Sequence, residues 1–461
     1  MRMTRLLLMM VVLGVACEPA PYQSPNLSSE PPPEKSAFVH FLVGSSPVPQ
    51  LALSLSQKVQ AVVGKREVGP RLELAAGQYP LSLDGEGLAP YTSGLLLLPG
   101  SETLLVAHVL PGLSSGRVRQ GLSAYSLGLR DPKQARLRVL HLAADAPPLA
   151  LAGPTGEVLL DGIAAGAVSA YSSLGTALGS DGKLLLRAPQ DQRALLEVTI
   201  PDGLPLGSTS TLVALGETDP LAEAADAFGL LAFDEASGTV RQLPIEPAPG
   251  APEGQIYLFH ASSELPGVSA KTTSGTLWGP VAYQSGTPLA ALAAGLHTLS
   301  LSESGLALWN GTLRLWPGRQ WLLLLHGTRK LPRLLALPRP ERAPQTVWRV
   351  VNLVEGLESC YLLDGDDAMV SALSYGTATV PKLGELKRRT LRLRDGQSSG
   401  LSWDIEFDAT AAGWAQDQVV TLVLSGDVAS KSSVTAQLLV ESRAASTMAV
   451  PALVLATTPT L

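Results

Sequence analysis

The apolar residues of this chain gather in short runs, and glycine, proline, asparagine and aspartate interrupt them. Runs of this length and punctuation predict β-strands joined by turns. Four of them resemble one another and end in a polar residue: 38–40, 137–141, 256–260 and 348–352, ending in His40, His141, His260 and Asn352. Their spacing is too long for a solenoid unit and suits domains of about 100 residues, so the pattern predicts four repeats.

Two further elements recur along the chain. Residues 74–83 and 292–301 both run from Leu-Ala-Ala-Gly into alternating leucines, which predicts a glycine turn followed by a strand with one face in a core. Each part also holds a late apolar strand, at 104–108, 212–216, 321–327 and 419–426. Uninterrupted apolar runs predict strands at the centre of a sandwich, buried on the core face and shielded on the other.

Helical periodicity is weak throughout. The best candidate is residues 219–228, where Asp219 would cap about two helical turns and Pro220 would open them. Short strands separated by turns dominate instead. The expected fold class is all-β, with tandem antiparallel immunoglobulin-like β-sandwich domains.

The first residues have the anatomy of a signal peptide. Two arginines precede the apolar run 6–15, which is far shorter than the roughly 20 residues of a membrane-spanning helix. Residues 13–17, Leu-Gly-Val-Ala-Cys, resemble a bacterial lipobox, and this resemblance implies that Cys17 receives the lipid. Gly14 stands where the lipobox usually has leucine, so plain secretion after cleavage at Ala16 is the alternative.

Proline-rich segments divide the chain. Residues 17–36 predict an extended tether, and 244–253 and 338–345 predict linkers. We therefore expect a signal peptide at 1–16, a lipidated Pro/Ser-rich tether at 17–36, and β-sandwich repeats at 37–134, 135–245, 254–338 and 346–461.

Composition narrows the function classes. If Cys17 carries lipid, Cys360 has no partner, so burial of apolar side chains must stabilise the fold, and 46% of the residues are hydrophobic. The net charge is −6 and only 16% of residues are charged, which disfavours nucleic acid as a partner. Past the leader no apolar stretch reaches about 18 residues, which predicts a soluble body.

The second repeat resembles a bacterial family. Residues 137–147 read Leu-Arg-Val-Leu-His-Leu-Ala-Ala-Asp-Ala-Pro, followed by Gly-Ala-Val-Ser-Ala-Tyr at 166–171 and Leu-Val-Ala-Leu-Gly at 212–216. These segments are similar to the domain-of-unknown-function 4397 family, most clearly over residues 135–243. The other repeats have drifted, and the fourth has Asn352 and Gly356 in place of the histidine and acidic residue. The resemblance implies exported or surface-associated domains and no particular activity.

Two repeats pair a histidine at a strand end with a carboxylate in the next loop. These are His141 with Asp145 and His260 with Glu264. Such pairs could bind a metal or act in acid–base chemistry. Because Asn352 cannot act as an acid or base, we favour a structural role, in which these residues brace the loop.

Other motifs suggest chemistry that their context does not support. Gly-x-Ser-x-Gly occurs around Ser114 and Ser398, without the helix that follows such a serine in hydrolases, so both predict hairpin loops. Asp364, Asp366 and Asp367 cluster as weak candidates for calcium ligands, although an Asp-Gly turn explains them equally well.

Two surface features suggest saccharide contact. The basic run 387–394 places its last two arginines on one strand face, which is usually solvated but could meet anionic envelope polysaccharide. Trp309, Trp316 and Trp321 crowd into one stretch, with a turn expected at Asn310-Gly311. They more often close the end of a sandwich than stack on sugars.

Together these features predict a lipid-anchored protein of the bacterial outer membrane or cell surface. Its repeats would make structural or adhesion-like contacts with envelope polysaccharide or protein, without catalysis, cofactor or nucleic acid. Surface and periplasmic orientations stay open. The alternative is an envelope hydrolase or carbohydrate-active enzyme that uses loop residues such as Ser114 or Asp145, and a third interpretation is a passive spacer.

Overall fold

The structure is a computed structural model. It describes residues 36–46, 48–86, 88–110, 119–128, 131–143, 145–174, 182–189, 193–340, 346–383, 389–396, 401–407, 418–429, 434–442, 452–455 and 457–460.

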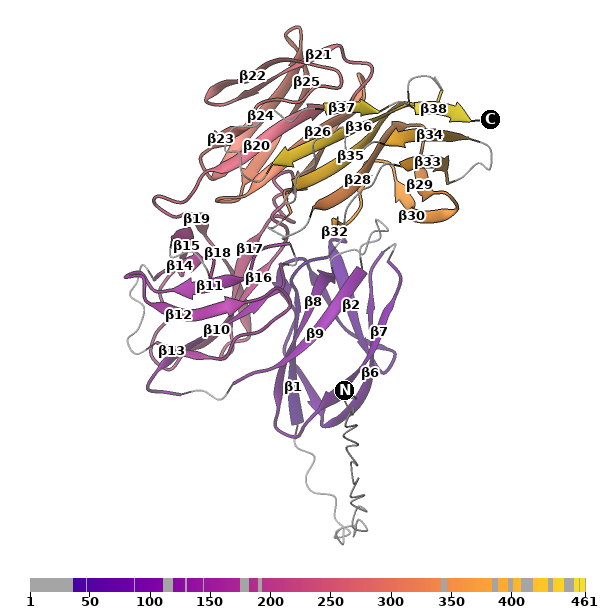
Figure 1. The fold of residues 1–461 in the computed structure, drawn as a ribbon. Coiled ribbons are helices and arrows are strands. Elements are labelled where there is room, and N and C mark those ends of the chain that lie inside the picture. Colours follow the sequence, from indigo (N-terminus) through magenta and orange to yellow (C-terminus); the bar gives the residue numbers. More distant parts are fainter. Residues whose placement is uncertain are drawn as a thin grey trace, which may run out of the picture.

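Within these ranges the chain forms strands and turns without any helix, so no described segment is a helix that could span a membrane. The strands form separate sheets of four to six, and pairs of sheets enclose apolar cores (Figure 1). The predicted all-β fold of tandem sandwiches is confirmed.

The first two sandwiches share a common plan. In the first, a sheet of order β4-β1-β8-β9, with β5 also paired to β1, faces a sheet of order β3-β2-β6-β7. Its strands are β1 (Ser36–Val43), β2 (Gln50–Leu55), β3 (Lys58–Gly64), β4 (Glu67–Val68), β5 (Leu72–Ala75), β6 (Gly77–Asp84), β7 (Tyr91–Leu97), β8 (Glu102–Leu110) and β9 (Arg119–Ser126). In the second, order β13-β10-β16-β17-β18 faces β12-β11-β14-β15-β19. Its strands are β10 (Ala135–His141), β11 (Leu149–Ala152), β12 (Val158–Ile163), β13 (Ser172–Leu174), β14 (Lys183–Arg187), β15 (Ala194–Thr199), β16 (Thr209–Leu215), β17 (Gly229–Asp234), β18 (Thr239–Leu243) and β19 (Ile245–Pro247).

The last two sandwiches repeat the plan. In the third, order β23-β20-β26-β27 faces β22-β21-β24-β25. Its strands are β20 (Gly254–His260), β21 (Gly267–Thr272), β22 (Gly275–Ala282), β23 (Ala290–Leu292), β24 (Gly295–Glu303), β25 (Leu306–Leu315), β26 (Gln320–Thr328) and β27 (Leu331–Pro338). In the fourth, order β31-β28-β35-β36-β37, with β32 also on β28, faces β30-β29-β33-β34-β38. Its strands are β28 (Val347–Glu355), β29 (Ser359–Asp364), β30 (Asp367–Ser374), β31 (Thr377–Ala378), β32 (Lys382–Leu383), β33 (Arg389–Asp395), β34 (Ser402–Phe407), β35 (Gln418–Asp427), β36 (Thr435–Ser442), β37 (Ala452–Leu455) and β38 (Thr457–Thr460).

One ladder in each repeat departs from the antiparallel pairing that the sequence predicts. The first strand runs parallel to the late apolar strand, as β1 with β8, β10 with β16, β20 with β26 and β28 with β35. Side chains along these strands alternate between the two faces of the sheet, yet every residue of β16 is buried. Both faces of the ladder are therefore covered, as the uninterrupted apolar runs suggested.

The outer face of each ladder is covered by a neighbouring repeat. Leu42, Leu104 and Val106 of the first repeat form one apolar cluster with residues of the second, among them Leu140 and Phe233. Tyr257, Phe259 and Leu324 of the third repeat do the same with Val351 and Val423 of the fourth. The chain is therefore two blocks of two sandwiches each, drawn as the lower and upper halves of Figure 1.

Three local predictions were wrong. Residues 219–228 form turns instead of a helix, because their polar groups bind neighbouring repeats, as described below. Asn310-Gly311 lies inside β25 and not in a turn, with Gly311 giving space to the indole of Trp309. The first part of the expected linker 244–253 is β19, which pairs with β15 and so extends the second sandwich past residue 245.

The contact between repeats can be tested at Phe233, which is fully buried between the first and second sandwiches. Phe233→Ala should lower the stability of that block by about 3–5 kcal/mol, because the cavity it leaves cannot collapse fully. Urea denaturation of the mature chain measures the loss of stability. Hydrogen exchange of the native protein, read in β8 and β16, shows where protection is lost. Val62→Ala is the control, since Val62 is 60% exposed. Equal protection in both variants would contradict the interlocked block.

Candidate functional site

A recurring turn fixes which residues correspond between repeats. In each, a residue with a left-handed backbone donates its N–H to a carbonyl of the first strand. The pairs are Arg66 to Val43, Gly166 to His141, Gln284 to His260 and Gly376 to Asn352. The residue equivalent to the three polar strand ends is therefore Val43. His40, which the sequence pattern aligned with them, lies three residues earlier and on the opposite face, where its Nε2 is 2.9 Å from Glu102 Oε1.

The side chains at this position brace the loop that follows. His141 Nε2 lies 3.0 Å from the carbonyl oxygen of Pro147, and His260 Nε2 lies 2.9 Å from that of Leu265. Asn352 Nδ2 donates to the carbonyl oxygen of Leu357 at 3.0 Å. Burial lowers the pKa of both histidines, that of His260 to about 4, so both rings are neutral near pH 7.

The paired carboxylates serve the opposite loop. Asp145 accepts the backbone N–H of Thr218 at 2.7 Å, and Glu264 accepts that of Arg329 at 2.8 Å, the equivalent position of the third repeat. In the fourth repeat the carbonyl oxygen of Glu355 accepts the equivalent N–H, that of Val428. Histidine and carboxylate thus hold two loops and make no direct hydrogen bond with each other, an arrangement without the geometry of an acid–base pair.

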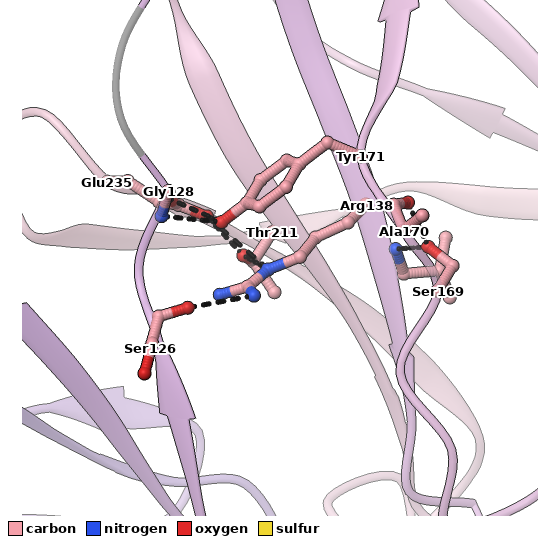
Figure 2. Close-up of polar contacts among 9 residues, drawn as sticks. Ser126, Gly128, Arg138, Ser169, Ala170, Tyr171, Thr211 and Glu235 are labelled. Carbon is pink, nitrogen blue, oxygen red and sulfur yellow. Dashed lines mark hydrogen bonds and ion pairs between the residues drawn. The ribbon is translucent and has the colours of Figure 1, made fainter.

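A buried polar cluster lies between the first and second repeats (Figure 2). Arg138 donates through Nε to Thr211 Oγ1 at 2.8 Å, and Thr211 donates to Glu235 at 2.5 Å. Tyr171 donates to Glu235 at 2.9 Å and accepts the N–H of Gly128 at 2.9 Å. Burial and the charge of Glu235 raise the pKa of Tyr171 to about 12, so the phenol stays a donor.

The arginine of this cluster also joins two repeats. Arg138 Nη1 donates to the carbonyl oxygen of Ser126, in the last strand of the first repeat, at 3.0 Å. In the second block Arg349 donates to Thr421 Oγ1 at 3.0 Å and to the carbonyl oxygen of Pro338, in the last strand of the third repeat, at 2.7 Å. Sequence reasoning missed both, although an arginine within an apolar strand was the available signal.

The two blocks meet through the segment 217–228. Lys65 of the first repeat lies 2.5 Å from Asp226, and Arg66 donates to the carbonyl oxygen of Ala227. From the third repeat Arg319 donates to Thr218 Oγ1 at 2.6 Å. Trp316 of the third repeat packs edge-on against Phe228, with ring centroids 4.6 Å apart. These contacts fix the segment in turns.

A cavity of about 280 Å³ lies beside this segment, lined among others by Asp145, Asp219 and Asp226. Burial, reinforced by the charge of Asp145, raises the pKa of Asp219 to about 6 despite a hydrogen bond from the N–H of Leu221. In the part of the chain that the structure describes, no group of three histidine, cysteine or acidic residues could hold a metal ion.

The remaining candidates are dispersed. Asp364 and Asp367 pair across a hairpin turn at Gly365, and Arg392 of the basic run binds Asp404 at 2.9 Å. Burial raises the pKa of the Cys360 thiol to about 12, which leaves it unreactive. Cys17, Ser114, Ser398, Lys387 and Arg388 lie outside the described residues. Trp316 and Trp321 are buried, and Trp309 is partly exposed.

No protein-family model matches the chain, and no curated protein matches it by sequence. The resemblance to the domain-of-unknown-function 4397 family therefore stays a prediction.

Asp219→Asn should stabilise the junction between the blocks at neutral pH. A pKa raised above its ordinary value means that the folded state binds the proton more tightly, so stability falls as the pH rises from about 4 to 6. The variant removes this loss of stability, which amounts to at most about 3 kcal/mol above pH 6. Thermal unfolding at pH 4.5 and 7.5 measures it; an unchanged pH dependence would contradict the raised pKa.

Arg138→Met should destabilise the first block by about 3–5 kcal/mol, because it removes one partner of a buried ion pair with Glu235. The double variant Arg138→Met/Glu235→Gln should recover most of the loss. Arg241→Met, which breaks an exposed pair with Asp202, is the control and should cost under about 1 kcal/mol. Urea denaturation measures all three, and equal effects of Arg138→Met and Arg241→Met would count against the cluster's role.

Proposed function

We propose that the chain is an exported, lipid-anchored cell-envelope protein whose sandwiches make structural or adhesion-like binding contacts without catalysis. The observation that carries this proposal is the interlocking of the repeats. Shared apolar clusters and buried arginines join sandwiches within a block, and the segment 217–228 joins the blocks. Such an array keeps its loops at fixed relative positions, as a spacer or presenting scaffold requires.

The uses of the candidate residues support a binding or structural role over hydrolysis. His141, Asp145, His260 and Glu264 are each occupied with loop backbone, so they are not arranged around a substrate. The hydrolase alternative would need Asp145 to leave the backbone N–H and hydroxyl of Thr218.

Anchoring rests on the sequence of residues 1–36, with its signal-like leader, Cys17 and proline-rich tether. A tether of this composition would hold the first sandwich away from the membrane surface. Cells that express the wild-type protein should keep it in the membrane fraction and incorporate labelled fatty acid, whereas Cys17→Ser protein should be soluble and unlabelled.

Cys360→Ala is the matched control, because Cys360 is buried and should play no part in anchoring. Protease added to intact cells then reports orientation. Cleavage of the membrane-bound protein would place it on the surface, and protection would place it in the periplasm as a structural element. Solubility of the wild type would refute the lipid anchor.

A further inference from the structure

A second cavity, of about 370 Å³, opens where the third and fourth repeats meet. It belongs to neither the loop-bracing residues nor the junction between blocks. Its lining combines two aromatic rings, a histidine and a cation, which belong to Trp309, Tyr375, His326 and Arg333, with aliphatic side chains between them. Its volume is at the small end of the roughly 300–1,000 Å³ of ligand sites, so it suits a ligand of one or two rings.

The indole of Trp309 lines the cavity and lies over the backbone of Gly311. Trp309 lies in β25 and packs against the core of the third sandwich while staying partly exposed. A Cβ at Gly311 would lie 2.5 Å from the indole, so only glycine leaves room for the ring in this position. The aromatic wall of the cavity is therefore built into the strand.

Another part of the lining is held by a chain of polar groups from both repeats. His326 Nδ1 lies 3.0 Å from the Tyr375 hydroxyl, which donates its proton to Glu355. Because that proton is committed to the carboxylate, Nδ1 must be the donor to the tyrosine oxygen. Burial lowers the pKa of His326 to about 4, so the ring is neutral near pH 7. Tyr375 is thereby fixed against the cavity.

Arg333 supplies the positive charge. It lies opposite His326 in the β26–β27 ladder, and among the described residues its guanidinium has no hydrogen-bond or ion-pair partner. A guanidinium offers paired donors that fit a carboxylate, and an aromatic face suits the apolar C–H face of a sugar ring. Cation and indole line one cavity of the size of a sugar.

We propose that this cavity binds a carboxylated sugar, a uronic acid residue of an anionic polysaccharide. The C–H face of the sugar would pack on Trp309, and its carboxylate would bind Arg333. This inference rests on the proposed binding role and names the class of ligand. It does not depend on the lipid anchor. A carboxylate on a peptide would use Arg333 equally well, but it would leave the indole unused.

The first repeat provides an internal comparison. His108 occupies the position of His326, and Tyr91 that of Trp309, by strand register. Opposite His108, however, stands Gly121 instead of an arginine. The proposed uronate site is therefore specific to the second block. The full chain should bind the sugar with a stoichiometry of one ligand per chain.

The test uses the mature chain carrying Cys17→Ser, with trimers of galacturonic, glucuronic and mannuronic acid and with neutral galactose trimers as probes. Calorimetry and saturation-transfer NMR should show binding of at least one uronate trimer, at least tenfold tighter than the neutral trimer. Arg333→Gln should weaken it at least tenfold and bring it to the level of the neutral sugar. Trp309→Ala should abolish it, and Trp309→Phe should retain part.

Arg392→Gln, a surface arginine of the fourth repeat, is the matched control and should bind like the parent. Thermal unfolding of each variant shows that loss of binding is not loss of folding. Absence of binding to every uronate trimer, or binding that Arg333→Gln and Trp309→Phe leave unchanged, would overturn the site. An acidic peptide that competes as well as the trimer would reassign it to peptides. None of these outcomes bears on membrane anchoring, which the fractionation of Cys17→Ser tests by itself.

Discussion

Burial of the parallel ladder on both of its faces is the constraint on which the array depends. In each repeat the first and a late strand lie side by side, with one face in the sandwich core and the other against a neighbouring repeat. Their apolar outer faces would be exposed in an isolated sandwich, so each sandwich needs a partner. This dependence makes two-sandwich blocks, and not single repeats, the structural units of the chain.

Polar groups at these buried faces have to be satisfied from within the protein. Arg138 and Arg349 do this with Nε, which donates to a threonine of their own repeat, and with Nη1, which donates to a backbone carbonyl of the preceding one. The two buried arginines therefore also specify which pair of repeats packs together. Since this arginine occurs in the second and fourth repeats, the two blocks look like copies of one two-sandwich unit.

The copies differ where a ligand could act. Both blocks place a histidine at the outer end of the late strand, but only the second faces it with an arginine that has no hydrogen-bond or ion-pair partner among the described residues, and with a tryptophan in the same cavity. Loops that brace the fold are repeated, whereas this combination is not. We therefore assign the repeated loop-bracing residues to the architecture, and the cavity that occurs in the second block to ligand recognition.

The sequence by itself determined the β-strands, their grouping into four repeats and the burial of the late strands, because alternation and turn residues are local signals. It also exposed the correspondence of His141, His260 and Asn352. It placed His40 wrongly, since a shift of three residues along a strand reverses the face, and only hydrogen bonds between strands define the register. The turns at 219–228 and the contact between the blocks depend on residues more than a hundred positions apart. Tertiary structure alone decided them, because their partners come together only when the sandwiches pack.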